Sequence, residues 1–191
     1  MPTLLWETVP CDEAAVAPLA DALGVTRVAA RLLCQRGLAD PETAARFLAP
    51  SLAQLHDPFR LAGMREAADR IEAAVARREP IAIHGDYDVD GITATVILRR
   101  MLEGIGGDVV HVLPDRLKDG YGLQAPAVER LHQSGVRLLI SVDCGIRSAA
   151  AACRARELGL DLIVTDHHEP DEELPPALAV INPKRHDCPY P

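Results

Sequence analysis

From residue 80 onward, short aliphatic runs alternate with longer stretches in which apolar residues recur three or four positions apart. The longer period is typical of helices that bury one face, and short β-branched runs are typical of buried strands. The aliphatic runs are 81–83, 109–113, 138–142, 162–164 and 179–181, and the helical stretches are 93–102, 125–132 and 148–158. A proline-rich stretch, and no helical pattern, precedes the fifth run. This alternation predicts an α/β fold: a parallel sheet of about five strands with helices on both faces.

Residues 1–79 show helical patterns and no catalytic motif of their own. The triplet Asp40-Pro41-Glu42 is typical of a helix start, because aspartate caps the free N–H groups and proline fits the first helical position. Ala67, Ile71 and Ala74 recur at helical spacing. We therefore expect a small helical N-terminal region over residues 1–79, followed by the α/β domain over residues 80–191.

The composition allows a buried core but restricts its chemistry. Hydrophobic residues make up 48% of the 191 residues and aromatic residues only 3%, so the core must be aliphatic. The five cysteines are an odd number, widely spaced and without a C-x-x-C pair, which favours reduced thiols over disulfides or a zinc site. No stretch approaches 18 uncharged apolar residues and no signal peptide is evident, so we expect no membrane association and a cytoplasmic location.

The formal net charge is −8, which on bulk electrostatics disfavours binding to nucleic acid. Bound cations would neutralise acids that are concentrated at one site. The charge therefore does not decide between a nucleic-acid enzyme and other functions.

The stretch IAIHGDYDVDGIT, residues 81–93, places three aspartates on alternating positions before a glycine. A calcium loop has this beginning, but its glutamate would fall at position 97, where the chain has Ile97. A calcium loop also follows a helix, whereas the run before these acids is typical of a strand. The acids therefore indicate a different site.

Polar residues follow four of the five predicted strands at the point where each strand ends. Ligands of open parallel sheets bind at this edge, so we expect these residues to converge. Their acids would repel one another unless cations were present, and two divalent ions would suit phosphodiester or phosphoanhydride hydrolysis. Carboxylates mixed with imidazoles favour Mn²⁺ over Mg²⁺, although Mg²⁺ stays an alternative. Asp143, alone at its strand end, is the natural bridge between the two ions.

Six stretches resemble the DHH phosphoesterase superfamily, in this order along the chain: the helical segment 32–64, GDYDVDGITAT, PDRLKDGYGL, SVDCGI, VTDHHEP and INPKRHDCPYP. Within it, they are similar to the bacterial exonucleases that degrade single-stranded DNA from its 5′ end. The resemblance implies a metal-dependent enzyme of DNA repair and recombination, with single-stranded DNA as substrate. It also implies a single-strand-binding protein and a helicase as partners.

The resemblance assigns roles to individual residues. His84, Asp88 and Asp143 would hold one ion, and Asp90, Asp143 and His167 the second. His168 would face the scissile phosphate and stabilise its charge, while Asp143 serves catalysis as the bridging ligand. Asp86, Asp166 and Asn182 would orient ligands and the loop around the site. Arg116 would contact a DNA phosphate, and Tyr121 would stack on a base, although a tyrosine that packs on its own loop is an equal alternative.

Family members carry a further metal-ligand aspartate and a DHH-associated domain beyond the INPK segment. On this resemblance we expect the chain to be an N-terminal fragment that binds metal weakly and has little activity alone.

Three alternatives remain at this point. The same ions could serve a DHH phosphodiesterase or pyrophosphatase that acts on nano-RNA, a cyclic dinucleotide or pyrophosphate. The chain could instead be a catalytically inactive scaffold, although such scaffolds lose metal ligands and this chain keeps them. Cys144 beside Asp143 could suggest a nucleophile, but no base is paired with it in the sequence.

Overall fold

The computed structural model describes residues 7–115, 120 and 122–191. The chain divides into two compact units, Met1–Leu55 and His56–Pro191. The first unit contains three helices and a 3-10 turn: α1 (Glu13–Leu23), α2 (Arg27–Gln35), α3 (Pro41–Leu48) and η1 (Leu52–Gln54). Asp40 caps α3 by accepting a hydrogen bond from the backbone N–H of Thr43, which confirms the predicted helix start.

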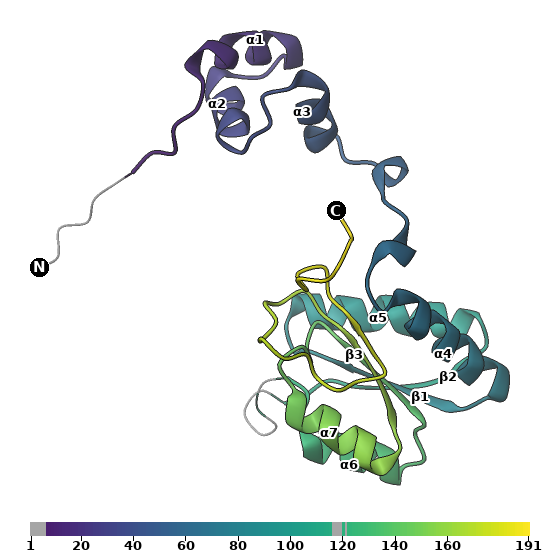
Figure 1. Cartoon of the computed structure of the whole chain (residues 1–191). Coiled ribbons are helices and arrows are strands. Elements are labelled where there is room, and N and C mark those ends of the chain that lie inside the picture. Colours follow the sequence, from purple (N-terminus) through teal and green to yellow (C-terminus); the bar gives the residue numbers. More distant parts are fainter. Residues whose placement is uncertain (1–6, 116–119, 121) are drawn as a thin grey trace, which may run out of the picture. The chain divides into compact units, whose positions relative to one another are not determined.

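The second unit is built on a five-stranded sheet in which every neighbouring pair of strands is parallel (Figure 1). The strand order is β2-β1-β3-β4-β5, which confirms the predicted parallel sheet. The strands are β1 (Pro80–Gly85), β2 (Asp108–Val112), β3 (Leu138–Val142), β4 (Asp161–Thr165) and β5 (Ala179–Ile181). β3 is buried along its whole length, so its sequence LLISV is nearly all apolar.

Helices cover both faces of the sheet, as predicted (Figure 1). α4 (Met64–Arg77) and α5 (Val89–Gly104) pack on one face, and α6 (Ala125–Gln133) and α7 (Ala149–Leu158) pack on the other. A short 3-10 turn, η2 (Pro58–Arg60), precedes α4. Side chains alternate along the strands, so Ile83 joins the core under α4 and α5 while Ala82 joins the core under α6 and α7.

The division between the compact units lies ahead of the domain boundary that the sequence suggested. α4 falls within the predicted N-terminal region 1–79, yet it belongs to the same unit as the sheet. Its Ala67 and Ala74 are buried in the core against the strands. Its Arg70 donates to Asp161 over 2.6 Å and forms an ion pair with Glu79. The second unit begins at His56, so it includes α4, which covers one face of the sheet together with α5.

The strand order reverses direction between β1 and β3, which are neighbours in the sheet. The chain leaves β1 into α5 on one face and leaves β3 into α7 on the other. Where helices diverge in this way, a crevice forms outside the carboxyl ends of the two strands, and ligands of open α/β sheets bind there. None of the helices in the described part of the chain has the length and apolar character that a bilayer crossing needs.

Candidate metal centre

The loop after β1 folds back tightly against the first turn of α5. Asp88 caps α5 by accepting a hydrogen bond from the backbone N–H of Gly91 over 3.0 Å, and this bond lowers the pKa of Asp88. A Cβ on Gly91 would lie 2.4 Å from the backbone nitrogen of Asp86. Only glycine permits this approach, which holds Asp86 and Asp88 side by side. Asp86 is buried, and its carboxylate accepts a hydrogen bond from the backbone N–H of Tyr87 over 2.7 Å.

Asp143 directly follows β3 and has a left-handed backbone conformation, with φ at 61°. Its backbone N–H donates to the carbonyl of Thr165 on β4 over 3.0 Å, which fixes the residue to the sheet. The residue is 8% exposed, and burial raises the pKa of its carboxyl group. Oδ1 lies 2.9 Å from Nε2 of His167, whereas the buried Oδ2 has no hydrogen-bond partner within the described chain. A buried carboxylate oxygen without a partner is unfavourable, and a cation would satisfy it.

Two groups of potential ligands meet at Asp143. Asp86, Asp88 and Asp143 form the first, and Asp143, His167 and His168 form the second. Within each group the ligand atoms lie within 4.8 Å of one another. The first group offers only oxygen, and the second mixes oxygen with imidazole nitrogen. The orphaned Oδ2 and these donor sets fit two divalent cations that share one carboxylate.

The loop after β4 is organised by the carboxylate of Asp166. Oδ1 accepts hydrogen bonds from the backbone N–H groups of His167 and His168 and lies 2.7 Å from Nδ1 of His168. Oδ2 accepts the backbone N–H of Ile146 over 2.9 Å. Burial alone would raise the pKa of Asp166, but these hydrogen bonds outweigh it and lower the pKa. The contact between the Asp166 carboxylate and Nδ1 of His168 raises the pKa of His168. The pair therefore favours a carboxylate that faces an imidazolium.

Asn182 holds the far side of this loop. Its side chain is fully buried, donates from Nδ2 to the carbonyl of His168 over 2.8 Å, and accepts the backbone N–H of Lys184. Lys184 also forms an ion pair with Glu169. The segment after β5 therefore fixes the backbone that presents His168.

Two of the predicted ligands, Asp90 and His84, lie outside the two ligand groups. Asp90 lies in the first turn of α5, and its Oδ2 is 4.0 Å from Nε2 of His167, at the rim of the site. His84 is only 2% exposed, lies on the α6 and α7 side of β1, and places Nδ1 3.8 Å from the sulfur of Cys144. Among the described residues, His84 joins neither ligand group, whereas Asp86 joins the first. The assignment of individual ligands stays a prediction.

Two predicted nucleic-acid contacts, Arg116 and Tyr121, lie outside the described residues. Cys144 is buried, and burial raises the pKa of its thiol, which keeps the group protonated. A buried neutral thiol is a poor nucleophile, so the environment of Cys144 does not suit covalent catalysis.

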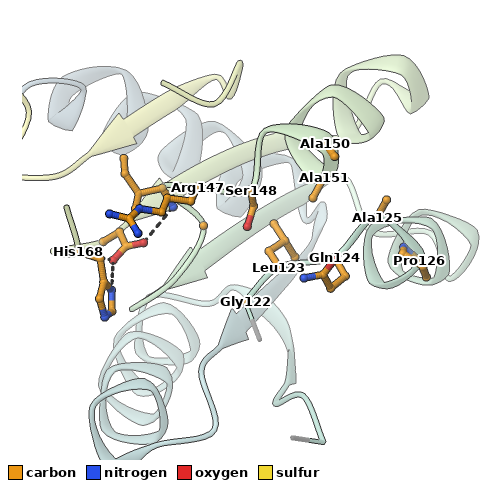
Figure 2. A pocket seen from close by; sticks show the side chains of 13 residues that line it. Gly122, Leu123, Gln124, Ala125, Pro126, Arg147, Ser148, Ala150, Ala151 and His168 are labelled. Carbon is orange, nitrogen blue, oxygen red and sulfur yellow. Dashed lines mark hydrogen bonds and ion pairs between the residues drawn. The ribbon is translucent and has the colours of Figure 1, made fainter. Parts of the chain in front are cut away.

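Sequence reasoning missed a cavity of about 320 Å³ beside His168 (Figure 2). Its walls come from the segment that enters α6, from the loop after β3, and from the first turn of α7. Glycines and alanines supply much of this lining, and small side chains leave no sequence signal of their own. Gly122 and Gly145 line the cavity with positive φ angles of 73° and 112°, and glycine at such positions is the signal that the sequence offered.

A comparison with protein families identifies one that covers the sheet and the acids and histidines at its edge. The model of the DHH family, N-terminal domain, matches residues 80–189. The chain therefore belongs to the DHH family.

Within that family the chain is similar to RecJ proteins. It is 43% identical over 186 residues to the single-stranded-DNA-specific exonuclease RecJ of Bacillus subtilis, covering 97% of this chain and 24% of that protein. The RecJ protein of Escherichia coli is 38% identical over 69% of this chain. A crystal structure of RecJ from Thermus thermophilus in complex with Mn²⁺ superposes with a TM-score of 0.71 at 35% identity, covering 95% of this chain and 25% of that one. The chain thus spans about a quarter of the length of these relatives.

We predict that Gly91→Ala disrupts the loop that holds Asp86 and Asp88. The added Cβ would overlap backbone atoms, so the loop or the first turn of α5 must shift. We expect a loss of about 1–3 kcal/mol in the free energy of unfolding, measured by chemical denaturation. Gly104→Ala, in the last turn of the same helix with open space around its Cα, is the matched control and should be neutral or slightly stabilising. Equal effects of the two substitutions would contradict this account of Gly91.

A second prediction concerns pH. His168 has a raised pKa in the folded protein, so its pairing with Asp166 stabilises the fold below the ordinary histidine pKa of about 6.5. That contribution is lost as the pH rises through the folded-state pKa. An NMR titration of the metal-free protein should show a lower pKa for His168 in Asp166→Asn than in the wild type. Asp171→Asn, an exposed acid of the same segment, is the control. An unchanged pKa in Asp166→Asn would contradict the pairing.

Proposed function

We propose that the protein is a metal-dependent exonuclease that hydrolyses single-stranded DNA from its 5′ end. The observation that carries this proposal is the position of Asp143, which belongs to both ligand groups and has a buried oxygen without a partner. A carboxylate in that position suits the bridge between two cations. The family and the relatives' names then narrow the chemistry to the cleavage of DNA.

The ions would be held by acids and two imidazoles from three strand ends. Asp88 and Asp143 would bind the first, with His84 as the third ligand that the family resemblance assigns, and Asp90, Asp143 and His167 the second. Mn²⁺ is supported by the mixed oxygen and nitrogen donors and by the manganese in structures of RecJ relatives. Mg²⁺ stays an alternative, since a RecJ relative also holds it. Bound ions would activate water as the nucleophile and offset charge on the scissile phosphate.

His168 is the residue of this chain that would act on the phosphate directly. Its Nδ1 faces Asp166, which leaves Nε2 as the nitrogen that can face a ligand. With its pKa raised, the imidazolium can donate a charged hydrogen bond to a phosphate oxygen as negative charge develops there. Asp166 and Asn182 position this ring through its Nδ1 and its backbone carbonyl. Asp86 would complete the acidic group from the buried side.

The names of the RecJ relatives support the proposed substrate, and the family resemblance suggests the partners and the setting. Their names specify single-stranded DNA, so we propose the same substrate here, with Arg116 and Tyr121 as contacts. A net charge of −8 opposes DNA binding until cations occupy the acidic edge, which makes metal a condition for binding as well as for chemistry. Action in DNA repair and recombination, in the cytoplasm and together with a single-strand-binding protein and a helicase, completes the proposal.

If the site binds metal, Mn²⁺ should raise the melting temperature of the protein. Ligand at about 100 times its Kd adds about 2.7 kcal/mol to the free energy of unfolding. Asp143→Ala should abolish the rise, because it removes the oxygen that both groups share, and EDTA should reverse it in the wild type. Asp69→Ala, on the exposed side of α4, is the control. If Mn²⁺ leaves the melting curve of the wild type unchanged, the proposed metal site is contradicted.

The nuclease assay uses the protein in the longest form that its gene encodes. With Mn²⁺ it should shorten a 5′-phosphorylated single-stranded oligonucleotide from the 5′ end and spare a blunt duplex. His168→Ala should reduce the rate by about 10²–10³, as does the loss of other groups that stabilise transition-state charge. His111→Ala, remote from the site on β2, should retain the rate. Faster release of phosphate from pyrophosphate, or hydrolysis confined to dinucleotides, would instead support the small-substrate alternative.

A further inference from the structure

The function proposed above leaves the cavity beside His168 without a role. We propose that it receives the nucleoside attached to the phosphate that is cleaved, an inference that rests on the function proposed above. We call it the nucleoside pocket and define it by residues 122–126, 145–148, 150, 151, 166 and 168. In Figure 2, His168 lies at one end of the pocket and the first turns of α6 and α7 lie at the other.

The position of the pocket supports this assignment first. His168 belongs both to the ligand group with Asp143 and His167 and to the wall of the pocket. A phosphate bound at this group would therefore place its own sugar at the pocket entrance. A second cavity that borders the ligand groups is lined by Asp90, Asp143 and His167 on the α5 side, and its acids suit cations rather than a nucleoside.

The chemistry of the walls supports it next. Leu123 and Ile146 form the apolar floor of the pocket, and each is only 2% exposed. Ser148 and Gln124 place a hydroxyl and an amide in the lining, and Arg147 lies at the exposed rim. A nucleobase has two apolar faces and a polar edge, which match this combination. Because stacking on an apolar surface accepts every base, we expect little discrimination between bases.

The size of the pocket restricts the occupant to a single unit. Its volume of about 320 Å³ is at the lower end of the range of about 300–1,000 Å³ for small-ligand sites. One nucleoside fits such a volume and a base pair does not. A base must therefore be unpaired to enter, which gives the protein a physical reason to act on single strands.

The space exists because α7 begins with four alanines, Ala149–Ala152. Ala151 is buried in the wall, while Ala150 lines the pocket from an exposed position. A larger side chain at position 150 would enter the pocket without disturbing the core. Ala149 is also exposed but does not line the pocket, so it offers a matched control.

The test measures binding by the Mn²⁺-loaded chain, without turnover. Isothermal titration compares thymidine 5′-monophosphate with deoxyribose 5-phosphate, which lacks the base. We expect the nucleotide to bind about ten- to a hundredfold more tightly, the effect typical of one base contact. Ala150→Phe should remove this difference while it leaves the affinity for deoxyribose 5-phosphate and the Mn²⁺-induced rise in melting temperature unchanged. Ala149→Phe should behave like the wild type.

Two results would contradict the assignment of this pocket to a nucleoside. One is equal affinity of the wild type for both ligands, and the other is a base-dependent difference that persists in Ala150→Phe. If Ala150→Phe does not fold, shown by its melting curve, Ala150→Leu takes its place with the same expected outcome. Failure of the proposed function gives a different pattern: Mn²⁺ no longer raises the melting temperature of the wild type, and neither phosphate ligand binds.

Discussion

The arrangement of the site depends on one electrostatic constraint, the confinement of several carboxylates at the edge of a single sheet. Asp86 and Asp143 are both buried there, and Asp88 lies within 4.8 Å of them. The carboxylate of Asp86 accepts the backbone N–H of Tyr87, the carboxylate of Asp88 caps α5, and the backbone of Asp143 is fixed to β4. Moving these acids apart would break such bonds, so the approach of positive charge is the less costly way to relieve their repulsion.

The two histidines that follow β4 share this edge but have different neighbours. His167 contacts Asp143 and belongs to the acidic side, whereas His168 contacts Asp166 and lines the nucleoside pocket. Adjacent residues can face two compartments because one carboxylate, that of Asp166, accepts the backbone N–H of both. The reacting phosphate would thus lie between a region that attracts cations and a region that accepts an apolar ring.

The sequence was sufficient for the sheet and for the convergence of acids, because both follow from strong periodicity and from the rule that parallel strands end at one edge. The role of His84 stays a prediction: the residue lies on the α6 and α7 side of β1, beside Cys144, and joins neither ligand group among the described residues. Which neighbours a strand residue meets depends on the helices that cover each face, and the sequence does not specify this. The compact unit begins at His56 because α4 packs on the sheet, a tertiary contact that no local pattern reports. The nucleoside pocket could not be predicted from the sequence either, because alanine and glycine residues reveal a cavity only in the folded chain.

The run of alanines at the start of α7 has a consequence for how such proteins can change. Position 150 touches the ligand space and the solvent but not the core. Residue size there can vary with little thermodynamic penalty, so substrate bulk can be tuned in small steps while the ion-binding edge stays intact. The size of one exposed side chain would thereby set how large a group can enter beside the proposed ion-binding edge.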